Sequence, residues 1–180
     1  MPQLKSISKA GIPEALAKAE LYRYLNEPEE AESICRDILA VDGEHQLAKR
    51  VLGLAITDQF SGTASDRYAE VHEIFQSLRD SYERHYYSGL LLERRAKAQL
   101  HAGCSPHILL PLVEEAMGLF SEAEKLRPAG NDDSILRWNR CARLLESRPE
   151  FRAQHPGPGE FEAADAPPVN IPTRRSASGR

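Results

Sequence analysis

Small residues recur at nearly regular intervals in this chain, within segments that are otherwise rich in helix-forming side chains. Ala19, Gly53 and Gly89 are separated by 34 and 36 residues. A small residue allows a neighbouring helix to approach closely, because little or no side chain stands between the two backbones. Repetition of such a residue at this period predicts helix pairs that stack on one another.

Helix formers dominate from about residue 13 to residue 147, and no stretch alternates apolar and polar residues with the two-residue period of a strand. Pro13 and Pro28 can each open a helix, because the first helical position needs no amide donor. A sixth helix is expected to become regular only at Pro111. The chain is therefore expected to be all-α, with seven helices. Their expected ranges are about 13–25, 28–41, from beyond 43 to 60, 67–80, 82–101, 111–127 and 134–146.

Composition narrows the functional classes. The 180 residues carry a formal net charge of −4, which argues against a nucleic-acid binder with a basic face. No apolar run approaches the roughly 20 residues that span a bilayer, and the N-terminus lacks the apolar core of a secretory signal. The three cysteines are odd in number and widely spaced, which favours reduced thiols. We therefore expect a cytoplasmic protein that binds neither nucleic acid nor membranes.

The chain divides into three expected regions. Residues 1–11 are expected to be a flexible N-terminus, and residues 12–147 a helical domain. From residue 148 the sequence becomes rich in Pro, Gly, Ala and Ser. Its apolar anchors are mainly Phe151, Phe161, Val169 and Ile171. So few anchors do not offset the entropy lost on ordering, and residues 148–180 are therefore expected to be a disordered tail.

The second helix of two expected pairs carries a common pattern of spacing. The two motifs are Ala31-x3-Cys35-x2-Ile38 and Ala116-x3-Phe120-x2-Ala123, each followed five residues later by Gly43 or Pro128. Together with the small residues of the first helices, this pattern resembles the tetratricopeptide repeat family, which repeats about every 34 residues. The middle pair departs from the pattern, because Tyr68 or Ala69 must serve as its small position and its connecting loop is longer.

The resemblance covers about residues 12–146 and implies a short right-handed superhelix of antiparallel helix pairs. It implies about three repeats and a capping helix, although the departures leave two or three as the count. The buried side of the capping helix would hold Trp138, Cys141, Leu144 and Leu145. The alternative is a generic helical bundle with accidental spacing.

The resemblance also implies a function and a binding surface. In this family the first helices line a concave groove that holds a segment of another protein. We therefore expect a non-enzymatic adaptor, scaffold or chaperone-like holder that needs no cofactor and binds an extended segment or a helix, with homo-oligomerisation as a further possibility. Ordinary packing between helices is the alternative role of each groove position. The expected groove residues are Leu16, Glu20, Arg23, Arg50, Leu54, Thr57, Tyr86, Leu90 and Glu93.

A second hypothesis rests on the loop that contains His101, Cys104 and His107. These residues carry nitrogen and sulfur atoms that zinc can bind, although a structural zinc site needs four ligands and no fourth is evident nearby. The rival function is an enzyme, or a metal- or redox-sensing subunit, that uses this loop. Cys35 and Cys141 fall at packing positions and are expected to be core residues.

The segment from Glu93 to Lys97 contains four charged residues within a helix that otherwise looks buried. One interpretation is a set of polar contacts that faces a ligand. The other is pairing within the helix on a solvated edge, such as Glu93 with Lys97, because side chains four residues apart lie on the same helical face.

Overall fold

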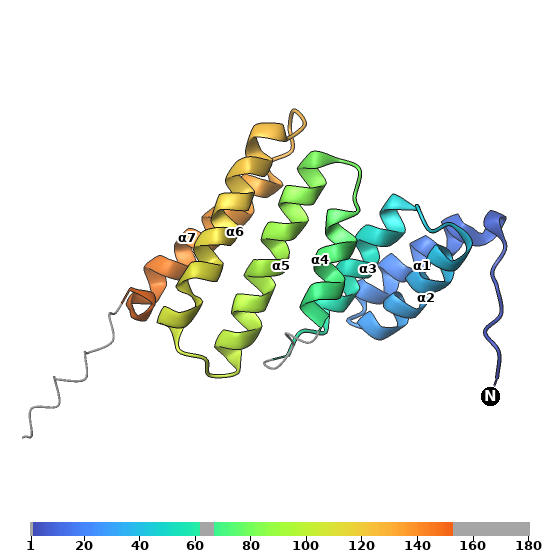
Figure 1. Ribbon diagram of the computed structural model, residues 1–180, viewed down its shortest axis with the longest axis horizontal. Coiled ribbons are helices and arrows are strands. Elements are labelled where there is room, and N and C mark those ends of the chain that lie inside the picture. The colour runs from blue at the N-terminus through green and yellow to red at the C-terminus, as the bar shows by residue number, and fades with distance from the viewer. Residues whose placement is uncertain (1, 62–66, 153–180) are drawn as a thin grey trace, which may run out of the picture.

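A computed structural model of the chain describes residues 2–61 and 67–152. These residues form seven α-helices and no strand, so the all-α prediction is confirmed for this part of the chain. The helices follow one another along the long axis of the molecule, with α1 and α2 at one end and α6 and α7 at the other (Figure 1). The helices are α1 (Ile12–Tyr24), α2 (Pro28–Val41), α3 (Gln46–Asp58), α4 (Tyr68–Gln76), α5 (Ser81–His101), α6 (Pro106–Leu126) and α7 (Asp133–Ser147).

Several helix starts follow from local sequence. Pro28 occupies the first position of α2, where the missing amide hydrogen costs nothing. The Asp80 carboxylate accepts a hydrogen bond from the Glu83 amide at 3.2 Å and caps α5. The first helix starts one residue earlier than expected, and α4 ends at Gln76 rather than at residue 80.

The start of α6 differs from the prediction. The helix begins at Pro106, five residues before Pro111, which lies inside it. A proline within a helix removes one amide donor. Pro106 supplies the first position here, and the apolar residues between the two prolines include Leu109, which is 1% exposed. The segment between Pro106 and Pro111 is therefore helical and partly buried, although the chemistry of proline alone predicted a helix only from Pro111.

Each helix pair packs around the same combination of residues. A methyl group added to Gly53 of α3 would lie 2.3 Å from the Phe75 ring of α4, and one added to Gly89 of α5 would lie 2.8 Å from the Phe120 ring of α6. In the first pair, Ala19 and Cys35 are fully buried in a single cluster. Gly53 and Gly89 therefore lie where the two helices of their pairs come close, and Ala19 is buried at the equivalent position of the first pair.

The middle pair uses a different residue from the one expected. Tyr68 is half-buried and Ala69 is exposed, whereas Val71 is fully buried. Val71, Phe75 and Leu78 repeat the four- and three-residue spacing of the other pairs, and all are at most 1% exposed. The small position of the pattern is thus filled by a valine, two or three residues later than the sequence suggested.

The first helices of successive pairs also contact one another, since α1 touches α3, α3 touches α5, and α5 touches α7. We call α1, α3, α5 and α7 the first-helix row. None of the helices in residues 2–61 and 67–152 combines the length and apolar character needed to cross a bilayer.

The ends of the folded unit differ from the expected boundaries. Residues 149–151 form a 3-10 turn, and Phe151 is only 1% exposed because it packs on α6 and α7. Part of the expected tail therefore belongs to the fold, and the remainder from residue 153 lies outside the described residues. Within the expected flexible N-terminus, residues 9–11 form a 3-10 turn and Ile7 is half-buried. Trp138, expected to be buried, is 37% exposed.

Candidate functional site

Ion pairs join the first helices across their exposed sides. Arg23 of α1 pairs with Asp58 at the end of α3 at 2.7 Å, and Arg94 of α5 pairs with the same carboxylate. Arg94 also donates hydrogen bonds to the Thr57 hydroxyl at 2.6 Å and to the Leu54 carbonyl at 3.1 Å. Three helices thus meet at one carboxylate with two guanidinium groups, which leaves one positive charge in excess.

The Arg94 side chain is largely buried, which changes its pKa. Its side chain is 22% exposed. Burial lowers the pKa of its guanidinium below the usual value, while Asp58 acts in the opposite direction. A few residues along the same helices, Arg50 of α3 pairs with Glu83 of α5 at 3.0 Å. Both contacts fix the position of α5 relative to α3.

The contact between α5 and α7 contains a buried charge. The Glu93 side chain is 2% exposed, pairs with Lys97 one turn later, and lies 3.6 Å from the guanidinium of Arg137. Arg137 also hydrogen-bonds Tyr86. The intrahelical pairing of Glu93 with Lys97 is therefore confirmed, but its expected position on a solvated edge is wrong, because Glu93 is buried. An unpaired buried carboxylate is costly, and the pairing of Glu93 with the two cations offsets part of that cost.

The nine expected groove residues fall into two groups. The exposed or half-buried group is Leu16, Glu20, Arg23, Arg50 and Leu54, and the buried group is Thr57, Tyr86, Leu90 and Glu93. The members of the buried group are each at most 9% exposed. The five accessible residues all lie on α1 and α3, so an accessible face exists only over part of the expected groove.

Helices α6 and α7 together bury the α5 positions, since the centre of the Tyr86 ring also lies 6.0 Å from that of the Phe120 ring of α6. Tyr86 and Leu90 belong to one apolar cluster with Cys141 and Leu144 of α7. Arg137 of α7 contacts Tyr86, as described above. In this arrangement α7 covers part of α5, so Tyr86, Leu90 and Glu93 pack inside the molecule and do not line an open surface.

Two exposed apolar side chains complete the accessible part of the row. Tyr24, four residues after Glu20, is 89% exposed, and Leu47, three residues before Arg50, is 42% exposed. Residues three or four apart share a helical face, so this spacing is a signal that the sequence contained. We call the accessible surface the first-helix face. It comprises Glu20, Arg23, Tyr24, Leu47, Arg50, Leu54, Asp58, Glu83 and Arg94.

A second charged cluster links α2 to the start of α4. Glu32 accepts hydrogen bonds from Arg67 at 2.6 and 2.8 Å, from Arg36 at 2.7 Å and from Gln59 at 2.7 Å. Arg36 also pairs with Glu70 at 2.6 Å. The hydrogen bond from Arg67 is the main reason why the pKa of Glu32 is lowered to about 2. Because these groups neutralise one another, the cluster connects adjacent helix pairs.

The loop that carried the rival hypothesis does not form a ligand cluster. His101 ends α5, Cys104 lies in the connection, and His107 is the second residue of α6. In residues 2–61 and 67–152 no group of three His, Cys, Asp or Glu side chains is placed to hold a metal ion.

The other two cysteines are buried, as expected for core residues. Burial is the main cause that raises the pKa of both the Cys35 and the Cys141 thiol to about 12. A thiol with so high a pKa is a poor nucleophile at neutral pH, because the thiolate is the reactive form.

Comparison with known proteins adds no assignment, since no family model, curated protein sequence or solved structure matches the chain.

Proposed function

We propose that this protein is a tetratricopeptide-like interaction module that holds a segment of another protein on the first-helix face. The observation that carries the proposal is that successive first helices contact one another, with Gly53 and Gly89 at close contacts with their second helices and Ala19 fully buried at the equivalent position. In a repeat array of this kind, a continuous surface is built from equivalent positions of successive helices. On this proposal the pairs form a short right-handed superhelix with the first helices on its concave side.

The chemistry of the first-helix face supports a mixed apolar and ionic contact. Tyr24, Leu47 and Leu54 supply exposed or half-buried apolar surface. Arg23 and Arg94 share one acidic partner, Asp58. Large aromatic and arginine side chains dominate the binding energy of many interfaces. We infer that the partner segment carries an apolar side chain and an acidic one, in an extended or helical conformation.

The contacts within the row support a preformed surface. Arg50 and Arg94 are already held by Glu83 and Asp58 in the chain alone. Side chains held in place before binding lose less entropy when a partner arrives. A module of this kind needs no catalytic group, and we propose that it acts as an adaptor or holder. The three unpaired cysteines support a reducing, cytoplasmic environment.

The test is affinity capture from native cell extract with the intact chain and a Tyr24→Ala, Leu47→Ala double variant. Both side chains are exposed, so their truncation leaves the core intact. A partner that binds the first-helix face should bind the double variant at least ~2 kcal/mol more weakly than the intact chain, which is roughly 30-fold. Leu136→Ala is the matched control, because Leu136 is an exposed leucine, 62% accessible, on α7.

Circular dichroism must give the same helix content and thermal midpoint for the three proteins. If the double variant retains all partners of the intact chain at unchanged affinity, the first-helix face is not the binding surface. If Leu136→Ala causes the same loss, the binding site lies on α7 instead.

A further inference from the structure

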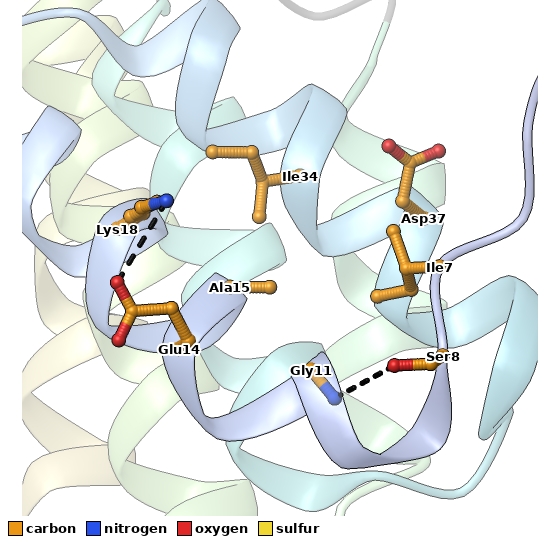
Figure 2. Close-up of a pocket in the computed structure, with 8 residues that line it drawn as sticks. All are labelled: Ile7, Ser8, Gly11, Glu14, Ala15, Lys18, Ile34 and Asp37. Carbon is orange, nitrogen blue, oxygen red and sulfur yellow. Dashed lines mark hydrogen bonds and ion pairs between the residues drawn. The ribbon is translucent and has the colours of Figure 1, made fainter.

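A pocket of about 300 Å³ lies at the end of the molecule formed by α1 and α2, away from the first-helix face. Ala15 of α1, Ile34 of α2 and Ile7 of the N-terminal segment surround it, as Figure 2 shows. All three side chains are half-buried and pack at the margin of the core cluster between α1 and α2. The volume is at the lower end of the range for ligand pockets, roughly 300–1,000 Å³, and suits one or two aliphatic side chains.

The edge of the pocket is acidic. Glu14 is 3.7 Å from Lys18 in an exposed pair, and both line the opening (Figure 2). Asp37 lines this pocket and also a smaller adjoining one of about 170 Å³, which lies beside Leu4 and Lys5. The Asp37 carboxylate forms no ion pair with any residue that the structure describes. It can therefore accept a cation from an occupant of either pocket.

The helix pair around the pocket is the most acidic part of the chain. Residues 12–44 contain nine Asp or Glu and three Lys or Arg, which gives a net charge of −6, against −4 for all 180 residues. The three basic residues, Lys18, Arg23 and Arg36, are each paired with a carboxylate. An occupant with positive charges beside an aliphatic group would therefore be attracted to this end.

The C-terminal sequence of this chain has that chemistry. Val169 and Ile171 carry its larger aliphatic side chains, and Arg174 and Arg175 follow Ile171 after two intervening residues. After Asp165 there are three arginines and no acidic residue, so the last 15 residues carry a charge of +3.

We propose that the pocket binds residues 169–175 of a second copy of the chain, with Ile171 in the apolar space and Arg174 or Arg175 at Asp37. Helices α1 and α2, whose residues line the pocket, and the end of α7 lie at opposite ends of the molecule (Figure 1). A tail bound within its own chain would have to run back along the whole molecule, whereas the tail of a neighbouring copy would not. The contact is head to tail, and repeated contacts of this kind extend into chains of copies or close into rings.

Sedimentation velocity of the full chain tests the proposal across roughly 10 µM to 1 mM, the range in which small interfaces of modest affinity form. The weight-average mass should rise above that of the monomer with concentration. Asp37→Arg and Ile171→Asp should each weaken self-association at least tenfold. Glu73→Arg is the matched control, because it makes the same change in net charge at an exposed site on α4 and should leave self-association unchanged.

Mixing the two variants gives the sharper result. Asp37→Arg retains its tail and Ile171→Asp retains its pocket, so a mixture should form one-to-one dimers and nothing larger. Raising the salt from about 0.1 M to about 1 M shortens the Debye length from about 10 Å to about 3 Å and should weaken the dimer. A full chain that stays monomeric throughout the range overturns the proposal.

A fluorescent peptide of residues 166–180 separates the remaining outcomes. It should bind the full-length Ile171→Asp chain one to one, and Asp37→Arg should weaken this binding at least tenfold. Peptide binding combined with a monomeric parent chain would mean that the tail occupies the pocket of its own chain, which overturns the second copy as the occupant. None of these results depends on the first-helix face, so failure here leaves the proposed function untouched.

Discussion

Replacing Gly53 by alanine adds one methyl group at the point where α3 packs against α4. That methyl carbon would lie 2.3, 2.6 and 3.0 Å from three atoms of the Phe75 ring. The ring is fully buried and packs against Tyr87, with ring centres 5.3 Å apart. Phe75 therefore has little room to move away, and the two helices must separate or the ring must leave its preferred rotamer.

The magnitude follows from two opposing effects. Alanine is favoured over glycine inside a helix by about 1 kcal/mol. Overpacking of a close-packed core typically costs 1–3 kcal/mol, and a contact this short falls at the upper end. Gly53→Ala should therefore lower the free energy of unfolding by about 1–2 kcal/mol. Urea titration measures this as a lower midpoint with an unchanged dependence of the free energy on urea concentration.

Gly118 supplies the matched control. It lies inside α6, is exposed, and a methyl group added there meets no described atom within 4 Å. Gly118→Ala should therefore raise the free energy of unfolding by about 0.5–1 kcal/mol. The double variant Gly53→Ala, Phe75→Leu should lose less free energy of unfolding than the two single variants lose in total, because the smaller leucine relieves the contact. If Gly53→Ala is as stable as Gly118→Ala, the close contact between α3 and α4 is wrong.

Three further results are expected. Phe151→Ala should lower the free energy of unfolding by about 3–5 kcal/mol in a urea titration, as for other buried phenylalanines. Deletion of residues 156–180 should change the thermal midpoint of the dilute protein by less than ~2 °C. If the deletion destabilises the protein as much as Phe151→Ala does, the folded unit does not end near residue 151. Because the pKa of Glu32 is lowered to about 2 from 4.5, its stabilising effect is present above pH ~4.5 and is lost as the pH falls towards 2. Glu32→Gln should lower the free energy of unfolding by about 1–2 kcal/mol at pH 7. It should also reduce the change in this free energy between about pH 4.5 and about pH 2. With a thiol reagent at pH 8, Cys104 should react first and the two buried cysteines much more slowly, and equal rates would show that the core opens readily.

The charges of the first-helix row have a structural role that bears on binding. Arg23, Arg50 and Arg94 each pair with a carboxylate on a neighbouring first helix. Exposed pairs of this kind contribute little stability individually, but together they align the helices that form the face. A partner that carries an acidic group would compete with Asp58 for the two arginines that share it.

The sequence by itself predicted the features that depend on residues close together in the chain. Seven helices, the pairing of Glu93 with Lys97 and the burial of Cys35 follow from side chains three or four residues apart, which share a face of a helix. The period of Ala19, Gly53 and Gly89 also located the close contacts at Gly53 and Gly89 and the burial of Ala19. Proline was a weaker guide at Pro111, since burial around Leu109 favours continuation of the helix.

Tertiary structure decided which neighbour covers each face. Tyr86, Leu90 and Glu93 have the spacing of exposed groove residues, yet α7, about 50 residues later, covers them through Arg137 and its apolar neighbours. Phe151 likewise becomes part of the core only because α6 and α7 meet beside it. Periodicity records that a helix has an apolar side, whereas the choice between a partner and another helix for that side depends on contacts between segments far apart in sequence.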